Sequence, residues 1–96
     1  MATRKKNYKN FKYVPRLYLS KLREAKGLSQ IRFASKIQMD RPTYNQIENG
    51  KQGFLMNARR LMKIAEVLGV PVEMVCREEI AYLDEVDKVN GIVREV

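Results

Sequence analysis

Apolar residues recur at spacings of three and four along most of the chain, and this period predicts amphipathic helices. The first predicted helix opens at Pro15, whose fixed φ suits a first helical turn, and ends at Gly27. A later helix begins at Asn57, whose side chain suits an N-cap, and ends at Leu68, which Gly69 follows. The residues that we expect to face the core are Tyr18, Leu19, Leu22 and Ala25 in the first helix, and Ala58, Leu61, Met62, Ala65 and Leu68 in the later one.

Between these helices, residues 29–51 predict two short helices joined by a tight turn. Ser29 is a good N-cap for the first helix, and Asp40 for the second, because its carboxylate also suits the positive end of the helix dipole. Pro42 fits the first turn of the second helix, where its missing N–H costs no hydrogen bond, and Gly50 signals the helix end. The expected inward residues are Phe33, Ala34 and Ile37 in the first helix, and Tyr44, Ile47 and Glu48 in the second.

Residues 70–96 predict a short fifth helix and a tail that has two interpretations. Pro71 opens the fifth helix, and the tail begins at about residue 78. Asn90-Gly91 can be a two-residue hairpin turn before a strand at 92–96, or it can end a helix over 79–89. We favour a helical continuation followed by a short strand. The apolar residues that would face inward are Val72, Val75 and Cys76 in the fifth helix, and Ile80, Leu83 and Val86 in a tail helix.

The length and apolar content suit one small domain, because 96 residues that are 45% hydrophobic can build one core but not two. The pattern therefore predicts an all-α fold, with a compact five-helix domain over residues 15–77. A basic N-terminal arm at 1–14 precedes it, and an acidic C-terminal tail at 78–96 follows it. A short strand at 10–14 is an alternative for the end of the arm.

The charge of the chain indicates an acidic partner, either nucleic acid or another anionic surface. The net charge is +8 and the isoelectric point is near 9.8. The charge is uneven, because residues 1–27 carry +8 and residues 28–69 carry +4, whereas residues 70–96 carry −4. The positive footprint therefore belongs to the first two-thirds of the chain. The arm either follows a phosphate backbone or is a solvated segment.

Several classes of site and location are not expected. The single Cys76 allows no intramolecular disulfide, and the absence of histidine leaves no Cys/His metal site, so we expect no metal and no cofactor. The sequence has no apolar run of 18 residues, which predicts a cytoplasmic protein with no membrane segment. Asp84, Glu85 and Asp87 lack a histidine, a nucleophile elbow or a phosphate loop beside them, so we do not expect an enzyme.

The outward face of the second short helix carries polar side chains that can read base edges. Arginine pairs well with guanine, and asparagine or glutamine pairs well with adenine. A polar face that only meets water is the alternative. The outward residues are Arg41, Thr43, Asn45, Gln46 and Asn49.

Four blocks of the sequence resemble the helix-turn-helix family of Cro and the phage repressors, often called Xre-like. The blocks are LREAKGLSQ, FASKI, IENGK and LMKIAEVLGV, and they occur in the order of the family within a resemblance that covers roughly residues 19–75. The resemblance implies a compact five-helix domain that binds double-stranded DNA through the second short helix.

The resemblance also implies roles for individual residues. It places base contacts on Arg41, Pro42, Asn45 and Gln46, and we add Thr43 from the same outward face. Phosphate contacts fall on Gln30, Asn49 and Lys51, and we add Arg32, whose charge suits a phosphate ligand. A buried ion pair is implied between Arg23 and Glu48.

Two departures from the family change these expectations. Gln38 stands where the turn usually has glycine, which requires a left-handed or reshaped backbone at a cost of about 1 kcal/mol. Pro42 replaces a polar base-reading residue, so that position offers only an apolar contact.

The sequence thus predicts a sequence-specific DNA-binding transcription regulator, and we expect a repressor that binds a near-palindromic operator as a homodimer. A phage, another mobile element or a chromosome could encode such a regulator. The alternative is an antitoxin-type module that autoregulates through the helix-turn-helix and binds a protein partner through its acidic tail. In either case the tail at 78–96 is the candidate element for dimerisation or partner binding.

Overall fold

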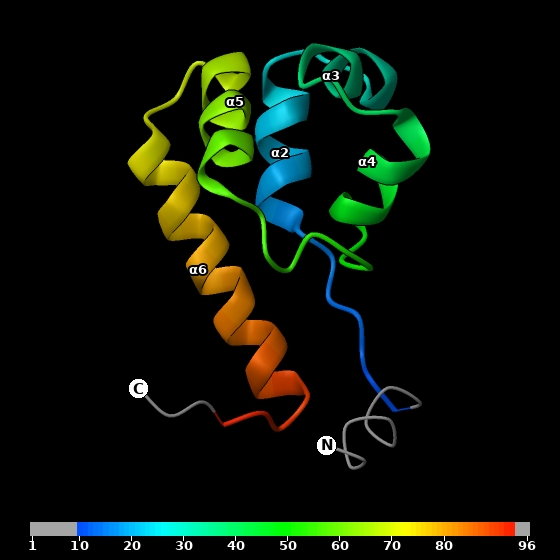
Figure 1. Ribbon diagram of the computed structural model, residues 1–96, viewed down its shortest axis with the longest axis vertical. Coiled ribbons are helices and arrows are strands. Elements are labelled where there is room, and N and C mark those ends of the chain that lie inside the picture. The colour runs from blue at the N-terminus through cyan, green and yellow to red at the C-terminus, as the bar shows by residue number, and fades with distance from the viewer. Residues whose placement is uncertain (1–9, 94–96) are drawn as a thin grey trace.

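The computed structural model describes residues 10–93, which form five helices and contain no strand (Figure 1). The all-α prediction is therefore confirmed, whereas residues 1–9 of the predicted arm and residues 94–96 of the predicted tail strand lie outside the described residues. α2 lies centrally, with α3 and α4 on one side and α5 and α6 on the other (Figure 1). The helices are α2 (Leu17–Ala25), α3 (Gln30–Lys36), α4 (Arg41–Glu48), α5 (Ala58–Leu68) and α6 (Val72–Val89).

The three helices for which the sequence predicts an N-cap, α3, α4 and α5, begin at that cap, whereas α2 does not begin at its predicted start. The side chains of Ser29, Asp40 and Asn57 each accept a hydrogen bond from the backbone N–H three residues later. α2 instead begins at Leu17, so the predicted start at Pro15 is wrong. The reason is a contact with another helix. Arg16 donates its backbone N–H to the carbonyl oxygen of Glu48, the last residue of α4, and therefore stays outside α2 as its N-cap.

The turn between α3 and α4 has the left-handed residue that the sequence required. Gln38 has a φ of 61°, and among the described residues it is the only one besides glycine with positive φ. Its N–H donates to Ser35 O at 3.0 Å, and the next N–H, of Met39, donates to Ala34 O at 2.9 Å. These two bonds close α3 as a Schellman motif, with glutamine in the position that glycine usually takes.

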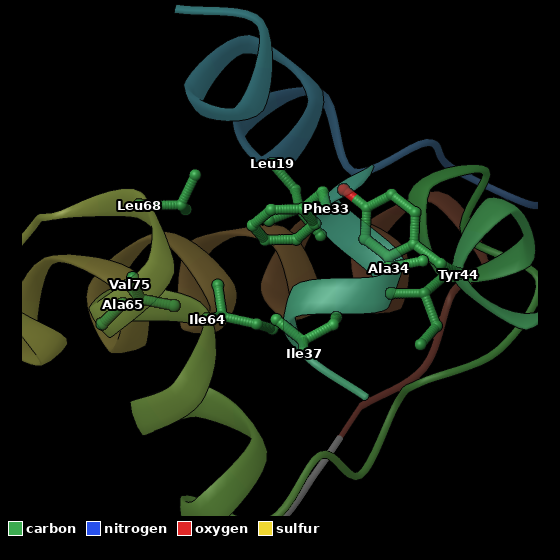
Figure 2. Packing of buried hydrophobic residues seen from close by; sticks show 10 residues of the cluster. Leu19, Phe33, Ala34, Ile37, Tyr44, Ile64, Ala65, Leu68 and Val75 are labelled. Atoms are coloured by element: carbon green, nitrogen blue, oxygen red, sulfur yellow. The ribbon is translucent and has the colours of Figure 1, made fainter. Parts of the chain in front are cut away.

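The core lies where α2, α3, α4 and α5 meet, and α6 covers it from the side (Figure 2). All six predicted inward residues of α3 and α4 are buried. In α5 the predicted face is partly wrong, because Ile64 is buried whereas Met62 is 59% exposed. Leu61, Ile64, Ala65 and Leu68 form a continuous stripe at i, i+3, i+4 and i+7, and Met62 lies about 100° away from its first member. The buried apolar cluster is Leu19, Phe33, Ala34, Ile37, Tyr44, Ile47, Ile64, Ala65, Leu68 and Val75.

α6 is one continuous helix of 18 residues, so the predicted boundary between residues 77 and 78 falls inside it. Asn90 is its C-cap and Gly91 is left-handed, which agrees with the helical interpretation of this dipeptide and not with a hairpin. In its second half the inward stripe is shifted by one position at two of the three predicted residues, whereas Val86 is buried as predicted. Glu79 is buried in place of Ile80, which is 60% exposed, and Tyr82 is buried in place of Leu83, which is half-buried.

The stripe is shifted because a buried arginine requires Glu79 on the inner face of α6. Arg16 is fully buried, and its Nη2 lies 2.8 Å from Oε2 of Glu79. Its remaining N–H groups donate to the backbone carbonyls of Ile47, Gln52 and Gly53. With Nε also bonded to the carboxylate, all five guanidinium N–H groups have acceptors. One side chain thereby joins the end of α4, the loop after it and the middle of α6.

A second buried ion pair joins α2 to α4. Arg23 Nε lies 2.6 Å from Glu48 Oε2, as the family resemblance implied for these two residues. Glu48 also accepts hydrogen bonds from the Tyr44 hydroxyl and, at 2.9 Å, from Gln30 Nε2. Burial opposes ionisation of Glu48, but the hydrogen bonds that it accepts outweigh burial and hold its pKa below the ordinary value.

The end of the arm crosses the C-terminal end of α4 at Gly50. A Cβ atom at this position would lie 1.9 Å from the carbonyl oxygen of Val14, and the φ of 78° is also left-handed. Only glycine allows this approach. Val14 therefore lies against the end of α4, and the residues before it run toward the C-terminal end of α6, where Lys12 bonds to Asn90 (Figure 1).

The strained turn predicts that Gln38→Gly stabilises the protein by about 1 kcal/mol, because glycine adopts the left-handed conformation without a Cβ clash. Gln38 is exposed, so the change should remove no packing. The matched control is Lys36→Gly, an exposed position in the last turn of α3, which should cost about 1 kcal/mol. Denaturant unfolding measures both, and a loss of stability in Gln38→Gly would contradict the strain.

The buried pair predicts that Glu48→Leu destabilises the protein by about 3–5 kcal/mol, because it leaves the Arg23 guanidinium without its carboxylate. Glu24 is the matched control, since it also lies near Arg23, at 3.6 Å, but its side chain is 69% exposed. Glu24→Leu should cost less than about 1 kcal/mol. A cycle of Arg23→Met, Glu48→Leu and the double variant, in which the losses simply add, would show that the pair does not interact.

The same pair predicts a dependence on pH. The pKa of Glu48 is below 4.5 in the folded state, so below pH 4.5 the unfolded state binds more protons. The contribution of Glu48 to the free energy of unfolding is therefore complete above pH 4.5, and it is lost as the pH falls through the pKa of Glu48 in the folded state. The difference in unfolding free energy between the native chain and Glu48→Leu should narrow over that window, and a constant difference would contradict the lowered pKa.

Candidate nucleic-acid interface

α3 and α4 present their N-terminal ends and one polar face to solvent, and Figure 1 shows them together on the side of the bundle opposite α6. The predicted base-contacting residues all lie on α4. Arg41, Pro42 and Gln46 are exposed, whereas Thr43 and Asn45 are half-buried. The face therefore offers a cation at its first turn and an amide about one turn later. This spacing suits a helix that enters the major groove with its N-terminal end first.

The first turn of α4 is fixed by its cap. The Asp40 carboxylate accepts the backbone N–H of Thr43 at 3.1 Å and its hydroxyl at 2.9 Å. These hydrogen bonds stabilise the charged carboxylate and lower the pKa of Asp40 below its ordinary value, and the bond from the Thr43 hydroxyl has the larger effect. Because the Thr43 hydroxyl donates to the cap, its methyl group is the part that remains for an apolar contact.

A chain of amide hydrogen bonds connects the outward face of α4 to the buried ion pair. Asn49 donates to Asn45 Oδ1 at 3.0 Å, and Asn45 donates to Gln30 Oε1 at 3.1 Å. Gln30 in turn donates to Glu48. The side chain of Gln30, which we expected to contact phosphate, thus has both ends of its amide engaged within the protein. Its geometry sets the orientation of Asn45, and its backbone N–H lies in the first turn of α3, where phosphates bind.

The remaining predicted phosphate contacts are exposed and lie around the same face. Arg32 is in the first turn of α3. Lys51 is the last residue of a Schellman motif that closes α4, because its N–H donates to Gln46 O at 2.8 Å. Gln46 is on the outward face of α4, and its Oε1 accepts a hydrogen bond at 2.9 Å from Gln52 in the loop after α4. The positive groups therefore flank the polar row of α4, which is the arrangement that a duplex with phosphates on both sides of the groove requires.

Two other kinds of feature, a metal site and a membrane-spanning helix, are absent from the described residues. Within 10–93, no group of three or more histidine, cysteine, aspartate or glutamate side chains could hold a metal ion. None of the helices in this part of the chain has the length and apolar character that crossing a bilayer requires. Cys76 is a free thiol and is half-buried on α6, less deeply than we expected.

Sequence reasoning missed the two residues that hold the end of α4 against α6. Arg16 was not considered, and Glu79 was counted with the acidic tail. One signal was available, because Glu79 falls on the helical stripe of Val75, Tyr82 and Val86. A carboxylate on an otherwise apolar stripe indicates a buried cationic partner. The sequence did not indicate which arginine or lysine supplies that partner.

Comparison with known families agrees with this geometry. The helix-turn-helix family, of the Cro and phage-repressor type, matches residues 19–75, which is more than half of the chain. A search of curated proteins returned no significant match. The matched region begins within α2 and ends within α6, so it includes the buried pair of Arg23 and Glu48 but neither Arg16 nor Glu79. This protein belongs to the Xre-like helix-turn-helix family of DNA-binding transcription regulators.

Proposed function

We propose that this protein is a repressor that recognises a near-palindromic operator as a homodimer, with α4 as the recognition helix. The observation that carries the proposal is the outward face of α4, where Arg41 and Gln46 are exposed one turn apart while the opposite face is buried. A helix that is fixed on one side and polar on the other can enter the major groove without rearranging. Arg41 suits guanine O6 and N7, and Gln46 suits adenine.

Phosphate contacts on both sides of α4 would set its register on the duplex. We assign this role to Arg32, Asn49 and Lys51, together with the backbone N–H groups at the start of α3. Such contacts carry no sequence information, because every base pair has the same backbone. They do make binding dependent on salt, since each neutralised phosphate releases counterions.

The dimer and the repressor role follow from the small size of the recognition surface. One recognition helix covers only a few base pairs, so useful discrimination needs two copies whose half-sites lie one helical turn, about 34 Å, apart. A two-fold axis between identical chains gives such an arrangement and matches a near-palindromic site. A chain of 96 residues that occupies its operator in this way can act by excluding other proteins from the site, which is repression.

The test is to select bound sequences from random duplex DNA and to compare variants on the selected operator and on a scrambled duplex. Arg41→Ala should lose about 1–3 kcal/mol on the operator, relax the preference at one base pair of each half-site, and change binding to scrambled DNA very little. The reason is that a base contact is made only with the right base. Gln46→Ala should behave in the same way at a different base pair.

Arg32→Ala is the matched control, because it also replaces an exposed arginine by alanine, but at a position assigned to phosphate. It should weaken both duplexes alike and flatten the slope of log affinity against log salt by about one unit. If Arg41→Ala and Arg32→Ala lose the same factor on both duplexes, direct readout by Arg41 is wrong. A selection that enriches no sequence would reject the sequence-specific regulator as a whole.

A further inference from the structure

An apolar groove of about 870 Å³ lies between the arm, the loop after α4 and the second half of α6, away from the outward face of α4. Figure 1 shows the arm running between the lower half of α6 and the end of α4. Neither the predicted base contacts nor the buried core uses this groove. Its apolar lining is Phe11, Tyr13, Phe54, Leu55, Ile80, Leu83, Val86 and Ile92.

The groove is built by specific contacts between the three segments. The ring of Phe11 meets the rings of Tyr13 and Phe54 edge to face, with centroids 5.4 and 5.9 Å apart. The backbone of Lys12 exchanges two hydrogen bonds with the side chain of Asn90, at 2.7 and 3.0 Å. These contacts hold the arm against the end of α6, so the hollow is part of the fold.

Large apolar side chains around the groove remain open to solvent. Leu55 is 97% exposed, Ile80 is 60% exposed and Tyr13 is 54% exposed. Contiguous exposed apolar surface of this kind marks sites of association, because burying it removes an unfavourable contact with water. Leu55 projects from the rim while the groove beside it is hollow, so the surface carries both a protrusion and a complementary recess.

We propose that this groove binds the same groove of a second copy of this chain and forms the two-fold interface of the dimer. A two-fold interface uses one patch on both copies, so the patch must be complementary to itself. Leu55 of each copy fills the recess of the other. The charges at the rim fit as well, because Lys51 lines the groove on the α4 side, whereas Asp84 and Asp87 line it on the α6 side with the opposite sign.

The rim charges also favour a second copy over a protein partner of one charge. A two-fold axis that runs along the groove brings the Lys51 side of one copy against the acidic α6 side of the other. A partner with charges of one sign would instead meet either Lys51 or the aspartates as like charges. Lys51 lies two residues after the C-cap of α4, which is Asn49. A copy docked here therefore lies beside the C-terminal ends of both recognition helices and leaves their N-terminal ends to the DNA.

The inference rests on the proposed function only for its link to the operator, so the first measurement uses no DNA. Sedimentation equilibrium of the full chain should show a monomer–dimer equilibrium. Ile80→Gln should weaken it by about tenfold or more, because the two-fold places this side chain in the interface twice. Leu55→Ser should have a similar effect. Met62→Gln is the matched control, since Met62 is 59% exposed on α5, and it should leave the dimer unchanged.

The second measurement uses a duplex with one half-site and a duplex with the full operator. Ile80→Gln should bind the half-site with native affinity and lose most of the extra affinity for the full operator. The proposal would be overturned if the native chain stayed monomeric up to about 1 mM. It would also be overturned if the dimers of Ile80→Gln and Met62→Gln had equal dissociation constants. A dimer that forms through the groove but shows no preference for any operator would instead reject the proposed function and leave the interface standing.

Discussion

The guanidinium of Arg16 joins three parts of the chain, which are the end of α4, the loop after it and the middle of α6. Arginine keeps its charge when buried, so a fully buried guanidinium needs a carboxylate and an acceptor for every N–H. Glu79 supplies the carboxylate, and the carbonyls of Ile47, Gln52 and Gly53 supply the remaining acceptors. The path of the loop after α4 and the rotation of α6 are therefore both determined by one side chain.

Together with Arg23, this arginine makes α2 and the residue before it the support of α4, the proposed recognition helix. Both arginines bind the C-terminal end of α4, Arg23 through Glu48 and Arg16 through the carbonyl of Ile47. Buried pairs gain little net stability, because desolvation offsets their attraction, but breaking one is costly. Their main effect is thus to exclude other orientations of α4. A face that is oriented in advance loses less conformational entropy when it binds DNA.

The sequence predicted well those features that depend on local chemistry, and less well those that depend on a distant partner. The caps at Ser29 and Asp40 follow from side chains a few residues away, and both are found. The left-handed backbone at Gln38 is one of the two forms that the family resemblance implied for the turn. The predicted start of α2 is two residues early, and two of the three predicted inward residues in the second half of α6 are one position late, because both features depend on Arg16. No periodicity could show that this residue reaches Glu79, which is 63 positions along the chain.

The central claim is that α4 reads base edges in the major groove, and methylation interference tests it most directly. Dimethyl sulfate methylates guanine N7, which is the major-groove atom that Arg41 is proposed to contact. In the selected operator, methylation of one guanine in each half-site should block binding of the native chain. The same methylation should have no effect on Arg41→Ala, which has already lost that contact. Equal interference with both proteins, or no interference at any guanine, would contradict readout by Arg41.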